Sequence, residues 1–294
     1  MSTEENKKKI KKLLVDISSH NSKNDKSGYY QDKTAIKFLF ELTRKGLDES
    51  KVRIRLTVLD SMYSTQMRMH PYGLEYLAKA IWEKLYNNNG DEPENTLKKI
   101  ATGGTGSCDE ADKIYNLFED EYGVDTNRAK AVSLISKYFY FETDCKFPIY
   151  DSIVREYLPI LYRYCGDKLP KAIPVNDIKQ YIKTINDFFD KIDYTRDGSR
   201  YDSLDHLLWV IGKILRGNLS LVLDARDYQT ITEQDTYQRI EPNKNKASFA
   251  FIKKNISDYE GYINGLINIL PDGDLNKKMA KIALNIINDE MASK

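Results

Sequence analysis

A carboxylate and two lysines near the middle of the chain have the residue types needed for nucleophilic or acid–base chemistry. Asp151 lies at the start of a predicted helix, and Lys130 and Lys137 lie on the predicted helix before it. The two lysines are seven residues apart, about two helical turns, so they could share one face. An attacking lysine must be neutral, which requires burial or a neighbouring cation to lower its pKa. The simpler interpretation makes Asp151 a helix N-cap and the lysines a solvated stripe.

A second group of candidate residues lies at the end of an apolar predicted helix that begins at Val52. The group comprises Tyr63, Ser64, Thr65 and Gln66. It places short hydrogen-bond donors and acceptors beside an aromatic ring. That combination can fill a gap in a stack of bases or hydrogen-bond a base edge. The simpler interpretation is a helix terminus whose hydroxyl groups are hydrogen-bonded within the protein.

The elements that must position these groups are helices, because apolar residues recur at helical spacing along most of the chain. Helices are predicted over residues 34–45, 52–66, 74–86, 110–121, 127–141, 152–164, 175–192, 202–215, 248–270 and 275–291. Residues 219–223 form the one predicted strand, and residues 87–95 form a loop. We therefore expect a mainly α fold.

The chain is expected to consist of three consecutive segments. Residues 1–30 would form an N-terminal helix and a polar loop, and residues 31–217 a helical domain. Residues 218–294 would form a mostly helical C-terminal segment that packs on this domain. No internal repeat is evident.

The charge balance limits what the chain can bind from a distance. Lysine and arginine number 45 against 44 aspartate and glutamate residues, which leaves a formal net charge of +1. Binding of nucleic acid would therefore need a local basic face. The N-terminus lacks the features of a signal peptide, and no run approaches the ~18 apolar residues of a spanning helix. We expect a cytoplasmic protein without a membrane partner.

Metal and cofactor chemistry is not indicated by the sequence. Cys108, Cys145 and Cys165 show no CxxC or CxxH spacing, and the chain holds 3 histidines. These features favour free thiols in a reducing compartment over a zinc or iron–sulfur site. His206 has no second histidine at a metal-binding spacing, so we expect it to be structural. We predict no metal and no cofactor.

Two adjoining stretches of the chain resemble a known family. They are SKYFYF at residues 136–141 and FPIYDS at residues 147–152. A helix with a Ser-Lys-aromatic pattern, followed by a short loop and Pro-Ile-Tyr-Asp-Ser, is similar to the helix-hairpin-helix DNA glycosylase superfamily. The resemblance is to bacterial proteins of uncharacterised type that are similar to 8-oxoguanine DNA glycosylases. LDSMYSTQ at residues 59–66 resembles the helix before the family's base-gap loop, and DHLLWVIGK at residues 205–213 resembles its closing helix.

The resemblance implies a glycosylase-like domain of several helices, with a cleft between two helical subdomains. It implies a DNA-repair hydrolase that breaks the N-glycosidic bond of a damaged or modified base, such as 8-oxoguanine, and that could also act as a lyase. Asp151 matches the family's catalytic aspartate. Lys137 and Lys130 compete for the place of its nucleophilic lysine. The Ser-Lys-aromatic pattern favours Lys137, whereas Lys130, 21 residues before Asp151, has the more usual separation.

The family's phosphate-binding hairpin is altered in this chain. EYGVDTNR at residues 121–128 stands in place of Leu-Pro-Gly-Val-Gly and contains one glycine. Thr126, Asn127 and Arg128, at a predicted helix N-terminus, could bind a DNA phosphate in another way. Tyr150 could stack on a base, although packing in an aromatic core is the commoner use of such a ring.

Two other hypotheses remain open at this point. The chain could be a relative that kept the fold and lost the chemistry, serving as a nucleic-acid-binding or defence-associated module. It could also be a helical interaction protein of another kind. The position of Asp151 separates the hypotheses: Lys137 or Lys130 pointing into the same cleft as Asp151, with basic residues around the rim, favours the glycosylase. If both lysines face solvent away from Asp151, only a glycosylase that uses water as its nucleophile is left. If Asp151 were sealed behind packed side chains, the glycosylase hypothesis would be excluded.

Overall fold

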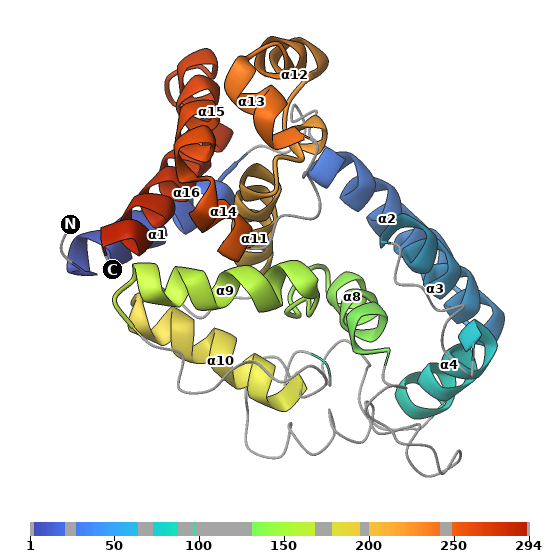
Figure 1. The fold of residues 1–294 in the computed structure, drawn as a ribbon. Coiled ribbons are helices and arrows are strands. Elements are labelled where there is room, and N and C mark those ends of the chain that lie inside the picture. The colour runs from blue at the N-terminus through green and yellow to red at the C-terminus, as the bar shows by residue number, and fades with distance from the viewer. Residues whose placement is uncertain are drawn as a thin grey trace. The chain divides into compact units, whose positions relative to one another are not determined.

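The computed structural model describes residues 3–20, 28–63, 73–87, 97, 131–167, 178–194, 200–241 and 249–292. In these ranges the chain is mainly helical and contains no β-strand (Figure 1). The predicted mainly α fold is thus confirmed. None of the helices in these ranges is long and apolar enough to cross a bilayer.

The chain divides into two compact units. Unit 1 comprises Met1–Gln31, Ser152–Pro170 and Ser203–Lys294, and unit 2 comprises Asp32–Asp151 and Lys171–Asp202. Each unit gathers segments that lie far apart in the sequence, whereas the expected segments 1–30, 31–217 and 218–294 are consecutive. The units and the segments are different divisions of the chain, and the segment boundaries stay a prediction.

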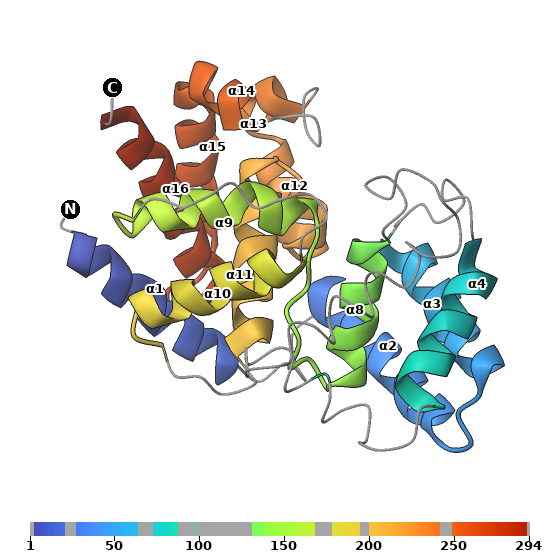
Figure 2. The same ribbon diagram turned by 90° about the horizontal axis from the view of Figure 1, so that it is seen from below.

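Unit 2 is built from helices of the first two thirds of the chain. They are most of α2 (Gly28–Arg44), α3 (Glu49–Tyr63), α4 (Gly73–Ile81), the π-helix η3 (Trp82–Tyr86), α8 (Val132–Glu142) and α10 (Ile178–Lys191). Helix α3 contacts α4 and α8, and the three lie side by side in both views (Figures 1 and 2). Helix α3 begins after Asp48, whose carboxylate accepts a hydrogen bond from the Lys51 backbone N–H at 2.8 Å, as an N-cap does.

Unit 1 contains the helix at each end of the chain. Its elements are α1 (Thr3–Ser18), α9 (Ser152–Tyr164), most of α11 (Arg200–Leu215), α12 (Ala225–Thr232), α13 (Asp235–Ile240), α14 (Phe249–Lys254), α15 (Ile256–Ile269) and α16 (Leu275–Ala292). Helix α16 contacts α1, α9 and α15. The buried Asn6 amide donates to the Tyr164 carbonyl at 2.8 Å and fastens α1 to the end of α9.

Gly166 ends α9 for two reasons. Its φ is +78°, a left-handed conformation that side chains rarely adopt, and a Cβ atom there would lie 2.1 Å from the Thr3 side chain. Glycine is therefore required both by the backbone and by the close approach of α1. The predicted helix over residues 152–164, with its stop at Gly166, is confirmed.

The predicted strand over residues 219–223 is wrong. Leu219–Leu221 form a 3-10 turn, and the backbone N–H groups of Val222 and Leu223 both donate to the Leu219 carbonyl, at 2.9 and 3.0 Å. The segment, LSLVL, is largely apolar, which a short buried strand would also accommodate. The same residues, however, place Leu219, Val222 and Leu223 at positions i, i+3 and i+4, which also bury one face of a helical turn. All three are buried, whereas Leu221 is exposed.

Three predicted helix boundaries also need correction. Helix α2 begins at Gly28 and not at residue 34. Helix α8 begins at Val132, since Ala131 has a non-helical ψ of 44°, and residues 127–130 lie outside the described part. The predicted helix over residues 248–270 is interrupted at Asn255, whose φ of −119° and ψ of 35° separate α14 from α15. The predicted helix over residues 110–121 and the loop over residues 88–95 lie outside the described residues.

Two buried tyrosines of unit 1 differ in their hydrogen bonding. The Tyr237 hydroxyl donates to the Gly217 carbonyl at 2.9 Å. The Tyr262 hydroxyl, on a ring 6.0 Å away, has no partner in the described part of the chain. We expect Tyr237→Phe to lower the free energy of unfolding by about 1 kcal/mol, because it leaves a buried carbonyl without its donor. Tyr262→Phe should leave that free energy unchanged or raise it. Urea unfolding of both variants checks this, and equal losses would contradict it.

Cys145 and Cys165 are buried free thiols, as predicted, and Cys108 lies outside the described residues. Burial raises the pKa of Cys145 from 9.0 to about 11 and that of Cys165 to about 12. When the pKa of a thiol is higher in the folded state than in the unfolded state, its contribution to folding stability is fully present below the unfolded-state pKa. That contribution is lost as the pH rises toward the folded-state pKa. Each thiol should therefore cost about 1 kcal/mol of stability on going from neutral pH to about pH 10. Urea unfolding against pH should show a shallower alkaline decline for the Cys145→Ala/Cys165→Ala variant than for the wild type. An unchanged decline would refute this assignment.

Candidate functional site

Helix α8 carries the candidate lysine and is buried along nearly its whole length. Its sequence is apolar or aromatic except at a few positions, as expected for a helix enclosed on all sides. Among those exceptions, Ser136, Lys137 and Glu142 are also buried. A buried polar group must find a partner within the protein. The partners of these three side chains therefore show which parts of the protein hold α8 in place.

A left-handed turn ends α8 and sends the chain back along it. Asp144 and Cys145 have φ values of 51° and 66°, and the Cys145 backbone N–H donates to the Tyr140 carbonyl at 2.6 Å. Thr143 closes the same turn, since its hydroxyl donates to the Phe139 carbonyl at 2.8 Å and accepts from the Lys146 N–H at 3.2 Å. The reversal brings residues 147–151 back toward the middle of the helix.

Ser136 fixes the returning segment, residues 147–151, to α8. Its hydroxyl oxygen accepts from the Tyr150 backbone N–H at 3.0 Å. The Tyr181 hydroxyl of α10 donates to the Ile149 carbonyl, and the Tyr150 ring packs edge-on against the Tyr181 ring, with centroids 4.9 Å apart. Asp151, the next residue, immediately precedes the first residue of α9. The carboxylate is thus held by its neighbours on both α8 and α10.

Lys137 points toward Asp151. Its Nζ lies 3.7 Å from Asp151 Oδ2 and donates to the Ser133 hydroxyl at 2.9 Å, one helical turn back. The face of the Tyr63 ring, at the end of α3, lies 5.2 Å from the same Nζ. The Lys137 side chain is 4% exposed and the Asp151 side chain 22%. The lysine is enclosed, and the carboxylate keeps an opening to solvent.

This arrangement can perform chemistry that neither group performs alone in water. A buried ammonium costs several kcal/mol unless it is paired, and Asp151 is the charged partner of Lys137. The same carboxylate can stabilise positive charge that develops on a neighbouring atom. An amine beside a carboxylate, largely shielded from water, is thus suited to attack a carbon that becomes electron-deficient.

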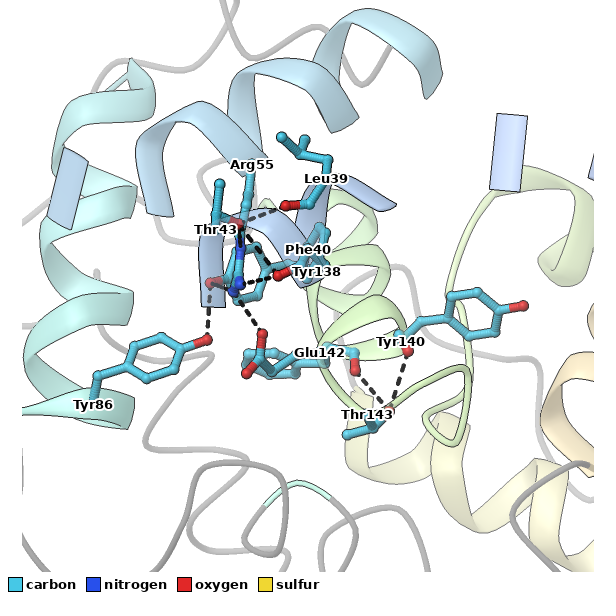
Figure 3. Close-up of polar contacts among 10 residues, drawn as sticks. Leu39, Phe40, Thr43, Arg55, Tyr86, Tyr138, Tyr140, Glu142 and Thr143 are labelled. Carbon is cyan, nitrogen blue, oxygen red and sulfur yellow. Dashed lines mark hydrogen bonds and ion pairs between the residues drawn. The ribbon is translucent and has the colours of Figure 1, made fainter. Parts of the chain in front are cut away.

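A second buried cluster holds α8 against α2 and α3 (Figure 3). Arg55 of α3 is fully buried, and its Nη1 donates to Glu142 at 2.7 Å and to the Tyr138 hydroxyl at 3.2 Å. Its other nitrogens donate to the Phe40 carbonyl and to the Thr43 hydroxyl of α2, both at 2.7 Å. We call Arg55, Glu142, Tyr138 and their partners the Arg55 network. The network holds the Tyr138 side chain in the core, and Tyr138 is the residue after Lys137.

The π-helix η3 contributes to this network. The hydroxyl of its last residue, Tyr86, lies 2.9 Å from that of Tyr138. Burial raises the pKa of Tyr138 to about 12 and that of Tyr86 well above its ordinary value, so both hydroxyls stay protonated and one can donate to the other. Burial also raises the pKa of Glu142, against the opposing pull of Arg55. Desolvation therefore outweighs the ion pair at this carboxylate.

The sequence prediction did not include the Arg55 network or Ser133. A signal for the network was present, because Arg55 falls among the apolar positions Val52, Leu56 and Leu59, which form the buried stripe of α3. A charged residue inside such a stripe indicates a buried partner. Ser133 lies four residues before Lys137, a spacing that brings side chains together on a helix.

The predicted site residues are only partly within the described chain. The structure brings Lys137, Asp151 and Tyr63 together. Tyr150 is adjacent, but it is 4% exposed and packs against Tyr181. Lys130, Ser64, Thr65, Gln66, Thr126, Asn127 and Arg128 lie outside the described residues, so their roles stay predictions. His206 is buried, and no three His, Cys, Asp or Glu side chains of the described ranges are grouped to hold a metal ion.

Comparison of the chain with protein-family models, with curated proteins and with solved structures gives no match. The functional argument therefore depends on the residues and their geometry.

Proposed function

We propose that this protein is a DNA glycosylase-like enzyme that releases a damaged or modified base, with 8-oxoguanine as the first candidate. The observation that carries the proposal is the proximity of Lys137 Nζ and Asp151 Oδ2, which lie 3.7 Å apart, with the Asp151 side chain 22% exposed. A glycosylase draws its target nucleotide out of the duplex, so the reacting groups can lie in a recess. The resemblance of residues 136–141 and 147–152 to the helix-hairpin-helix family supports the same reading of these two groups.

The proposed reaction uses Lys137 as the nucleophile. Its Nζ, after losing one proton to solvent, forms a bond to C1′ of the deoxyribose as the bond between C1′ and the base nitrogen breaks. The base leaves with that electron pair and takes up a proton from solvent. Asp151 stabilises the positive charge that develops on the sugar. Opening of the sugar ring and loss of the amine proton then give a Schiff base, from which elimination of the 3′ phosphate would constitute the lyase activity.

A specific observation favours a second candidate function, a nucleic-acid-binding or defence-associated module without catalysis. The Lys137 side chain is 4% exposed, as expected of a purely structural ion pair. In that case Asp151 would serve as a helix cap and Lys137 as its buried counter-ion.

Borohydride trapping on duplex DNA distinguishes the two functions. Oligonucleotides carrying 8-oxoguanine, other modified bases or an abasic site would be incubated with the protein, and both base release and the reduced covalent adduct would be measured. The glycosylase proposal requires base release from at least one lesion, and its lyase part requires the adduct. No release and no adduct across the panel would support the non-catalytic module.

A further inference from the structure

Two arginines of the described residues are buried, and their guanidinium groups are bonded very differently. Arg55 donates through all three of its nitrogens and has Glu142 as its counter-charge. Arg200 is 1% exposed, but its Nε and Nη1 have no hydrogen-bond partner in the described part of the chain. Native proteins rarely bury a charge without pairing it, because the loss of hydration is costly. Arg200 is therefore a buried cation with two unused nitrogens.

The groups that surround Arg200 are neutral. Its Nη2 donates to Asn186 Oδ1 of α10 and to the Tyr201 hydroxyl, both at 2.7 Å. Its Cζ lies 5.0 Å from the centroid of the Phe189 ring and 4.8 Å from that of the Tyr201 ring. Aromatic faces attract a cation, but they do not replace a counter-ion. All of these residues belong to unit 2.

The carboxylate closest to Arg200 in the sequence is bonded to other groups. Asp202 accepts from the Lys33 ammonium and from the Tyr140 hydroxyl of α8. No carboxylate of the described residues forms an ion pair with Arg200. Arg200 is also the first residue of α11, a helix of 16 residues, and the N-terminus of a helix favours negative charge nearby. The chain thus gathers positive charge here without an anion to balance it.

We propose that Arg200 binds a small oxyanion, such as inorganic phosphate, which supplies the counter-charge and accepts hydrogen bonds from Nη1. The site shares no residue with the Lys137–Asp151 pair and does not depend on the glycosylase reaction. Arginine suits this task because its N–H groups point in fixed directions and match the oxygens of phosphate and carboxylate. Nε and Nη1 are both closed to solvent, so the ion must be small and enters only when the surrounding side chains move.

Two substitutions separate an ion site from a structural arginine. Arg200→Met removes the cation, and it leaves Asn186 Oδ1 bonded to the Tyr201 hydroxyl, which donates to it at 2.9 Å. Asn186→Asp has nearly the same shape as the wild type and places a carboxylate against Nη2. This variant carries the missing counter-charge within the chain, so it should no longer need a bound ion.

Urea unfolding in sodium chloride and in sodium phosphate of equal ionic strength tests the proposal. Phosphate stabilises folded proteins in general, so the result is the difference between the wild type and the variants. At a phosphate concentration ten times the dissociation constant, the unfolding equilibrium constant of the wild type should fall about tenfold further than that of either variant. In chloride, Asn186→Asp should unfold at a higher urea concentration than the wild type. Equilibrium dialysis with radiolabelled phosphate should find saturable binding to the wild type and none to Arg200→Met.

Equal phosphate responses in the wild type and both variants would overturn the proposal, as would the absence of phosphate bound in dialysis. If Arg200→Met does not fold, Asn186→Asp answers the question by itself, because it keeps the arginine in place. Adenosine monophosphate at the same concentration is the size control. A stabilisation by the nucleotide as large as that by inorganic phosphate would also contradict the proposal, since the enclosed guanidinium has no room for a nucleoside.

Discussion

Replacing Lys137 with glutamine is expected to abolish the covalent adduct with an abasic site, by a factor on the order of 10³ or more. Glutamine has no amine that can form a Schiff base, and its amide can still donate to Ser133. Asp151→Asn is expected to lower the rate of adduct formation on the base-containing duplex by about 10²–10³, because it removes the charge that stabilises the sugar cation formed as the base leaves. The measurement is single-turnover borohydride trapping at saturating protein.

Lys146→Gln is the matched control for this series. It removes a lysine that lies close in the sequence, in the turn after α8, and that has no part in the proposed site. Its adduct yield should equal that of the wild type. If Lys137→Gln still forms the adduct, the nucleophile is another residue, and Lys130→Gln would then test the alternative lysine. Loss of the adduct in both lysine variants would require a check that each is folded.

The second large effect is expected at Arg55. Arg55→Met should lower the free energy of unfolding by about 3–5 kcal/mol, because removal of one partner leaves Glu142 buried without its counter-charge. The Phe40 carbonyl loses the Arg55 donor in the same change, and the Tyr138 hydroxyl loses one of its two partners. The double variant Arg55→Met/Glu142→Gln should recover part of this loss, since a buried neutral amide costs less than a buried unpaired charge.

The pH dependence of Arg55→Met provides a separate check. Burial raises the pKa of Glu142 even beside Arg55, and without the guanidinium it should rise further. A Glu142 pKa that is higher in the folded state makes folding most favourable below the unfolded-state pKa of about 4.5. Above that value the free energy of unfolding falls as the pH rises. The destabilisation should therefore be smaller at about pH 5 than at about pH 7.5. Urea unfolding at both values measures it, and an equal loss at the two would show that Glu142 is not the cause.

Local sequence signals were sufficient for some elements and not for others. Helix α9 was predicted to its residue, because Asp151 before it and Gly166 after it mark its ends. The strand predicted at residues 219–223 was wrong, because five mostly apolar residues fit a short helical turn equally well. Only the tertiary surroundings decide between the two in so short a segment.

The candidate site shows a similar limit. Lys137 and Asp151 are 14 residues apart in the sequence, and helical periodicity cannot bring them together, since the left-handed turn at Asp144 and Cys145 intervenes. Their pairing was expected from a resemblance, and the geometry of the ion pair comes from the structure alone. Ser133 could have been found by its spacing from Lys137, but a serine in an apolar helix is usually bonded only to its own backbone.

The division of the chain into units has a consequence for the timing of any reaction at this site. Lys137, Ser133 and Asp151 all belong to unit 2, and the boundary falls after Asp151, between it and Ser152. A rigid-body displacement of one unit would leave the distance between amine and carboxylate as it is. The reacting groups would thus be preorganised in the free protein, with no assembly step between substrate arrival and bond breaking.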